Sequence, residues 1–97
     1  MKRAKALQVL KNHLPEIRQR FGVTHLALFG STSRDEAGLE SDIDILVTFD
    51  GPATSSRYFG LQFYLEDLLD APVDLVTDKA LRPELRPYVE QEAIHVA

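Results

Sequence analysis

The chain has 97 residues, of which 44% are hydrophobic and 27% are charged, as is typical of one globular domain spanning residues 1–97. The absence of cysteine excludes disulfides, thiolate zinc sites and thiol catalysis. A formal net charge of −4 argues against avid, non-specific nucleic-acid binding, which depends on neutralising phosphates with Lys and Arg. The sequence shows neither a signal-peptide pattern nor an apolar run of membrane-spanning length, so we expect a cytoplasmic protein with no membrane association.

The first part of the chain predicts two helices followed by a strand. Apolar residues recur at helical spacing within residues 3–20. Pro15 interrupts this pattern and is expected near the first turn of the second helix, which should end at Gly22. The apolar residues 23–29 then predict a strand.

The middle of the chain predicts a connection, a strand and a helix. Residues 35–41 are polar and are expected to connect two strands, either as a simple loop or with a short helical turn. Residues 43–49 carry apolar side chains on both faces of the predicted strand, which indicates a central strand covered on both faces. Thr54 or Ser55 can cap a helix that runs to about Leu69.

The last part of the chain predicts one more strand, a helix and an edge strand. Pro72 introduces the strand 73–77, a final helix should begin at residue 83 or 84 and end near residue 92, and residues 94–96 suggest a short edge strand. Strands separated by helices in this order predict an α/β or α+β sheet with its helices mainly on one side.

A Gly-Ser pair and two closely spaced aspartates carry the strongest chemical signal. Gly30 and Ser31 close the first predicted strand, and Asp42 and Asp44 open the next. Residues two apart on a strand point to the same face, so these aspartates can hold cations between them. Gly30 allows close backbone approach to a ligand, while the Ser31 hydroxyl and nearby N–H groups can bind phosphate oxygens. Together these features indicate magnesium-nucleotide chemistry.

Asp74 is the natural third carboxylate. Two-metal chemistry gathers acidic side chains around ions about 3.5–4 Å apart, and Asp74 interrupts the otherwise apolar strand 73–77. Burying that carboxylate is costly unless it is paired or bound to metal. Plainer interpretations are a salt bridge for Asp74, a strand-capping role for Asp42 and Asp44, and an ordinary turn for Gly30.

Other polar and aromatic residues give weaker signals. Arg34 is equally compatible with gripping phosphate and with a surface role beside acidic neighbours. The three histidines show no metal-ligand spacing and are interpreted as structural or surface residues. The aromatic residues between 58 and 64 are expected to pack in the core or against a partner.

Residues 30–34 and 41–47, followed by 72–76, resemble the signature of the DNA polymerase β-like nucleotidyltransferases. The likeness covers almost the whole chain and is strongest to the minimal nucleotidyltransferases, although Asp35 stands where many relatives carry glycine. The resemblance implies a small mixed sheet with active carboxylates at one end. It also implies an antitoxin of a type VII-like pair, which modifies its HEPN-domain ribonuclease toxin and forms a hetero-oligomer with it.

Our first functional hypothesis is therefore an enzyme that transfers AMP from ATP to a toxin hydroxyl, expected to be a tyrosine, with two Mg²⁺ ions. Gly30, Ser31 and Arg34 would bind the nucleotide, while Asp42, Asp44 and Asp74 would bind metal, with Asp74 also activating the nucleophile. One alternative is a non-catalytic module that neutralises a toxin by binding. Another is nucleotidyl transfer to a small molecule or an RNA end.

Overall fold

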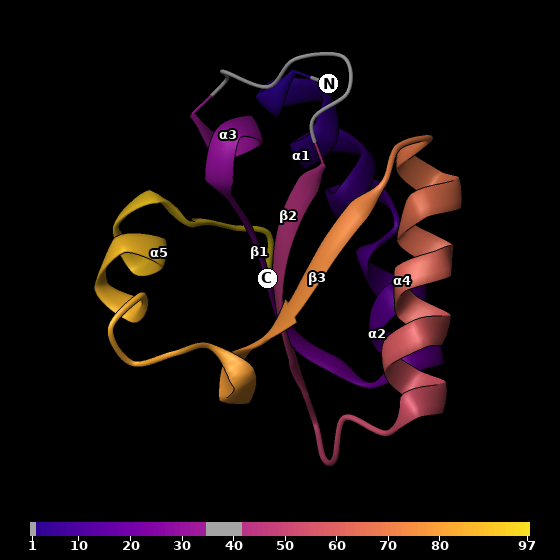
Figure 1. The fold of residues 1–97 in the computed structure, drawn as a ribbon. Coiled ribbons are helices and arrows are strands. Elements are labelled where there is room, and N and C mark those ends of the chain that lie inside the picture. The colour runs from indigo at the N-terminus through magenta and orange to yellow at the C-terminus, as the bar shows by residue number, and fades with distance from the viewer. Residues whose placement is uncertain (1, 35–41) are drawn as a thin grey trace.

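The computed structural model describes residues 2–34 and 42–97, which form one mixed sheet with helices on both sides (Figure 1). The strand order is β3-β2-β1-β4. β1 and β2 are antiparallel, β2 and β3 are parallel, and β4 pairs antiparallel with β1. The strands are β1 (Val23–Phe29), β2 (Ile43–Phe49), β3 (Val73–Thr77) and β4 (Ile94–His95).

The hydrophobic core lies between one face of the sheet and three helices: α1 (Arg3–Asn12), α2 (Leu14–Phe21) and α4 (Ser55–Leu69). Short pieces complete the described fold: α3 (Gly30–Ser33), the 3₁₀ turn η1 (Asp78–Ala80) and α5 (Arg86–Glu92). In Figure 1, α5 lies on the opposite side of the sheet from α2 and α4.

The helix boundaries follow from local chemistry. Pro15 lies in the first turn of α2, where its missing N–H has no intrahelical partner to lose. Gly22 ends α2 with a left-handed φ of 67°, which glycine adopts without steric cost. The Thr54 hydroxyl accepts a hydrogen bond from the Arg57 N–H and so caps α4. These three predictions are confirmed.

Side chains alternate across the sheet and give it two different faces. In β2, Ile43, Ile45 and Val47 are buried against the helices, whereas Asp44 and the other alternate positions are only half-buried. The prediction that β2 is covered on both faces is therefore wrong. The second face carries the polar residues and is referred to below as the open face.

Helix α4 supplies hydrogen bonds to the edge strand β3. The Tyr58 hydroxyl donates to the Leu75 carbonyl at 2.5 Å, and Gln62 Nε2 donates to the Val73 carbonyl at 3.2 Å. Glu66 Oε2 accepts from the Val73 N–H at 3.0 Å. These side chains recur every four residues on one helical face and satisfy backbone groups that an edge strand leaves unpaired. They fix the strand that carries Asp74.

The remaining differences from the sequence predictions are local. Gly30 begins a single helical turn, α3, where the sequence suggested only a close backbone approach. Helix α5 begins at Arg86, later than predicted, because residues 83–85 form a turn. The predicted polar connection at residues 35–41 lies outside the described residues.

Candidate active site

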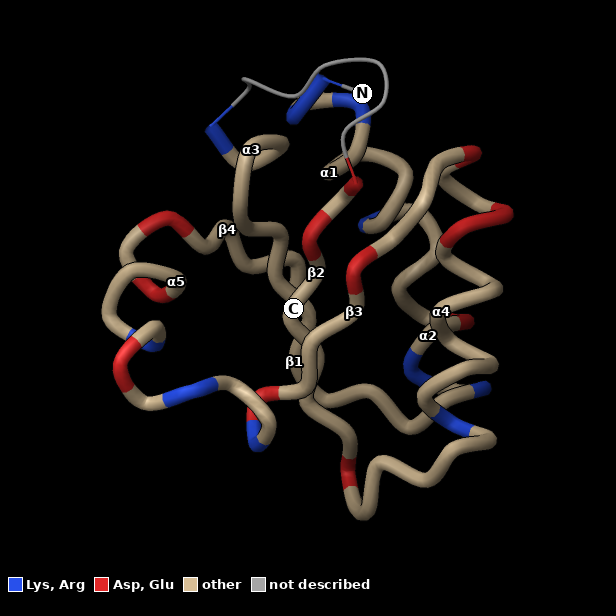
Figure 2. Tube along the Cα trace, in the orientation of Figure 1, with Lys and Arg blue, Asp and Glu red and all other residues tan. Residues whose placement is uncertain are grey.

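Two carboxylates stand side by side where β2 meets β3. The parallel register pairs Asp44 with Asp74, so both side chains project from the open face. Asp42 precedes β2 by one residue and is exposed. Figure 2 shows acidic positions of the two strands next to each other near the same end of the sheet. The prediction that Asp74 is buried is wrong, because β3 is an edge strand and Asp74 lies exposed on its open side.

This arrangement makes Asp44 hard to ionise. Burial, followed by the negative charges of Asp74 and Asp42 and a hydrogen bond shared with Asp74, raises the pKa of Asp44 from 3.8 to about 6. Glu92 contributes further negative charge. A half-buried carboxylate held close to other carboxylates is the electrostatic pattern expected of a site that binds positive charge.

Gly30 meets Asp44 directly. Phe29 is the register partner of Asp44, and the next residue, Gly30, has a left-handed φ of 71°. A Cβ built on Gly30 would lie 2.0 Å from Asp44 Oδ2, so no larger residue fits without moving this carboxylate. The α3 turn that follows is closed by a 2.7 Å hydrogen bond from the Ser33 hydroxyl to the Gly30 carbonyl. Glycine is therefore required by both backbone conformation and space.

Arg34 and Gly30 meet a fourth carboxylate, that of Glu92 at the end of α5. Glu92 Oε1 accepts a 3.0 Å hydrogen bond from the Gly30 N–H, and Oε2 pairs with Arg34 Nη1 at 2.5 Å. Glu92 is not predicted as a site residue from the sequence, because it lies 62 residues from Gly30 and has no spacing signal of its own. Arg34, left undecided by the sequence, stands beside Gly30 with its charge directed at this anion.

The donor set fits a magnesium ion that shares its ligands with a nucleotide. Within residues 2–34 and 42–97, no three acidic or histidine side chains converge closely enough to enclose an ion by themselves. Mg²⁺ in phosphate-transfer sites is commonly held by one or two carboxylates, waters and substrate phosphates, so a complete protein cage is not needed. The paired oxygens of Asp44 and Asp74 are donors of the required kind.

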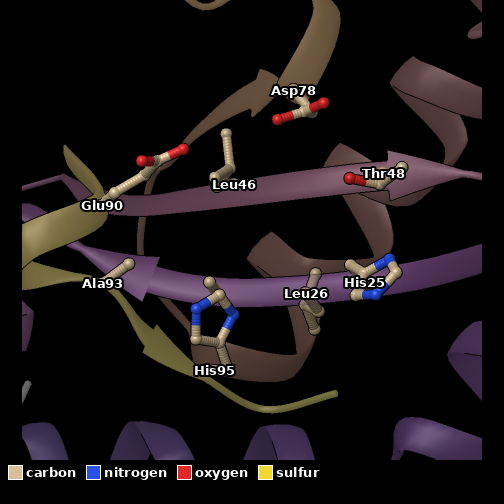
Figure 3. Close-up of a pocket in the computed structure, with 9 residues that line it drawn as sticks. His25, Leu26, Leu46, Thr48, Asp78, Glu90, Ala93 and His95 are labelled. Atoms are coloured by element: carbon tan, nitrogen blue, oxygen red, sulfur yellow. The ribbon is translucent and has the colours of Figure 1, made fainter. Parts of the chain in front are cut away.

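The open face also contains a hollow of about 340 Å³ farther along β1 and β2. Ala27 and Leu46 contribute its apolar floor, with His25 and His95 among the polar residues that line it. Figure 3 shows Glu90 and Ala93 reaching it from the α5 segment. Its lining includes neither the paired carboxylates nor Gly30, so this hollow is separate from the candidate phosphate and metal groups.

A mixed sheet with carboxylates on neighbouring strands beside a glycine turn is the arrangement expected of a nucleotidyl-transferring core. The chain belongs to the nucleotidyltransferase domain family, whose model matches residues 10–96. It falls among the minimal nucleotidyltransferases, and the fold and enzyme class expected from the sequence are confirmed.

Individual relatives narrow the comparison. The chain is 40% identical over 88 residues to protein adenylyltransferase MntA of Thermococcus cleftensis, covering 91% of this chain and 89% of that protein. It superposes with a TM-score of 0.82 on the structure of a protein provisionally described as a minimal nucleotidyltransferase, at 35% identity, covering 97% and 95% of the two chains. A toxin–antitoxin crystal structure with AMP-PNP contains a chain that matches at 25% identity and a TM-score of 0.75, covering 90% of this chain and 72% of that one.

Proposed function

We propose that this chain transfers AMP from ATP to a hydroxyl, expected to be a tyrosine, of a HEPN-domain ribonuclease toxin, and so acts as the antitoxin of a type VII-like pair. The observation that carries the proposal is the Asp44–Asp74 pair on the open face beside Gly30. The proposal is also supported by the similarity of this chain to the Thermococcus protein adenylyltransferase and to a chain of a toxin–antitoxin complex.

The proposed nucleotide-binding groups lie at one end of β1. Gly30 and Ser31 would position the triphosphate through backbone N–H groups and the serine hydroxyl, with Arg34 offsetting its charge. In the present structure the Gly30 N–H and the Arg34 guanidinium already hold an anion, the carboxylate of Glu92. This contact supports their assignment as anion-binding groups.

The proposed reaction is an in-line displacement at the α-phosphorus. The acceptor hydroxyl oxygen forms a new bond to the α-phosphorus. The bond from this phosphorus to the oxygen that bridges the α- and β-phosphates breaks, and pyrophosphate leaves. Asp74 would accept the hydroxyl proton, while Asp42 and Asp44, with Asp74, would hold two Mg²⁺ ions. When bound, Mg²⁺ supplies positive charge that offsets the triphosphate and lowers the pKa of the attacking hydroxyl.

The same proposal includes the organisation of the protein. Residues 1–97 would act as one domain and form a hetero-oligomer with the toxin, whose own surface would present the acceptor. Among the described residues, no helix is both long and apolar enough to cross a lipid bilayer. A cytoplasmic location remains part of the proposal.

Co-expression with a HEPN-domain toxin, the partner that we propose for this chain, tests the proposal. We expect the wild-type chain to restore growth and the toxin to gain the mass of one or more AMP units. The Asp42→Asn, Asp44→Asn double variant, which keeps the size of both side chains, is the matched control and should do neither. Rescue by the double variant without added mass would instead support neutralisation by binding. Wild-type rescue without added mass would contradict AMP transfer to the toxin.

A further inference from the structure

The carboxylate of Glu92 lies where an anionic phosphate would be expected to bind. It reaches two different positive groups at once, the Gly30 N–H at 3.0 Å and Arg34 Nη1 at 2.5 Å. Glu92 approaches from α5, which lies on the other side of the sheet from the core helices (Figure 1). Its side chain is 27% exposed and that of Arg34 is 46% exposed, so both can be reached from solvent.

These contacts and a bound triphosphate compete for the same groups. The Gly30 N–H has one hydrogen and cannot serve Glu92 and a phosphate oxygen equally well. Arg34 has several N–H donors, but the negative charge of Glu92 would remain next to a polyanion. Glu92 also adds negative charge around Asp44. Its present position therefore opposes the binding of any anion at Gly30 and Arg34.

We propose that Glu92 competes with the triphosphate of ATP for Gly30 and Arg34. The Glu92 carboxylate must release both groups before ATP binds in its productive position. This inference rests on the proposed function, because it concerns the same nucleotide site. It adds a residue that controls access to that site and couples nucleotide binding to the position of α5.

The structure explains how α5 can respond. The helix has seven residues, and Val89 is the one buried residue within it. Arg86 pairs with Glu90 on the same helix and with Asp78 of the preceding turn, so those ion pairs do not attach α5 to α3. The Glu92 contacts join α5 to Gly30 and Arg34 across the fold. Losing them should loosen α5 while the core between the sheet and the other helices stays intact.

Nucleotide affinity tests the competitor directly. Calorimetric titrations of the full chain should use Mg-ATP and, separately, inorganic triphosphate with Mg²⁺. Glu92→Gln retains an oxygen that can accept from Gly30 but removes the charge, and we expect it to lower Kd for both probes by about tenfold, the loss of one charge-assisted competing contact. Glu90→Gln is the matched control, because Glu90 lies on the same helix and pairs with Arg86; its Kd should equal that of the wild type.

Three outcomes of these titrations distinguish the competing role of Glu92 from the proposed nucleotidyltransferase function, on which that role rests. If Glu92→Gln binds the probes more tightly than the wild type does, and Glu90→Gln does not, the result supports Glu92 as a competitor, even where wild-type binding is too weak to measure. Equal or weaker binding by folded Glu92→Gln, with measurable wild-type binding, overturns the competitor and leaves the proposed function standing. No binding by either protein overturns both.

Hydrogen exchange on the wild-type chain gives an answer that does not depend on the variant folding. Saturating Mg-ATP should slow amide exchange around residues 30–34 and accelerate it in residues 86–93, because α5 loses its attachment. Slower or unchanged exchange in residues 86–93 on nucleotide binding would overturn the competitor, since Glu92 would then have kept its place.

Discussion

Replacing Asp44 by asparagine should stabilise the protein in the absence of ligand. Asp44 has its pKa raised from 3.8 to about 6 by burial and by the neighbouring charges of Asp74 and Asp42. At one pKa unit per about 1.4 kcal/mol, this rise corresponds to about 3 kcal/mol of unfavourable free energy when Asp44 is ionised. Asp44 is only half-buried, so solvent screening reduces the expected gain for Asp44→Asn to about 1–2 kcal/mol.

The gain should depend on pH in one direction. The folded protein keeps the Asp44 proton up to about pH 6, whereas the unfolded chain loses it near the ordinary value of 3.8. Between these values the folded state binds more protons, so the contribution of Asp44 to the free energy of unfolding falls as the pH rises through this window. Asp44→Asn lacks this loss. It should therefore be the more stable protein at pH 8 and equal to the wild type at pH 4.

Thermal melts in EDTA at both pH values measure the effect. For a domain of this size, the gain at pH 8 should raise Tm by about 5–10 °C. Asp67→Asn is the control, because Asp67 is an exposed acid on α4, and its Tm should change little at either pH. Adding Mg-ATP should shrink or reverse the advantage of Asp44→Asn, since the wild type gains more binding energy. If Asp44→Asn instead melts below the wild type at pH 8, Asp44 has a stabilising structural partner and does not destabilise the ligand-free protein.

Three further predictions concern the nucleotide site. Gly30→Ala should lose AMP transfer, and its free energy of unfolding should fall by about 2 kcal/mol or more, because the new Cβ would lie 2.0 Å from Asp44 Oδ2 at a φ of 71°. Gly51→Ala is the control, because its Cβ would have its nearest contact at 3.6 Å, and it should change neither activity nor stability. In a labelled-AMP assay, Ser31→Ala should retain more activity than the Asp42→Asn, Asp44→Asn protein, because backbone N–H groups still hold phosphate; equal loss in a folded Ser31→Ala protein would contradict this order. Calorimetry should detect ATP binding with Mg²⁺ and much weaker binding in EDTA, since the triphosphate otherwise meets several carboxylates, and equal affinities would contradict the metal requirement.

The elements of the fold could be predicted because their signals are local. The strands at 23–29, 43–49 and 73–77 follow from short apolar runs bounded by Gly, Pro or Asp, and all three were predicted with the bounds that the structure shows. Gly22 marked the end of α2 because a left-handed residue there favours glycine. The start of α5 was harder, because Pro83 is compatible both with a first helical turn and with the turn that precedes Arg86.

The burial and the contacts of the site residues depend on which strands and helices are neighbours in the fold, and the hydrophobic periodicity of the sequence does not reveal this. The apolar character of β2 suggested cover on both faces, yet strand order leaves its second face to Asp44 and its neighbours. Asp74 was expected to be buried because its strand is apolar, but β3 lies at the edge of the sheet. Glu92 was missed because its contacts with Gly30 and Arg34 arise from α5 folding back over 58 or more residues. Predicting such a contact requires the three-dimensional fold.

The most direct test of the central claim is intact mass spectrometry of the purified toxin after incubation with ATP, Mg²⁺ and this chain. We expect the wild-type chain to add AMP to the toxin and EDTA to prevent the addition. Replacing Asp44 by asparagine should abolish the addition in a protein that remains folded. Addition of AMP by the folded Asp44→Asn protein at the wild-type rate would show that the paired carboxylates of β2 and β3 do not carry the reaction.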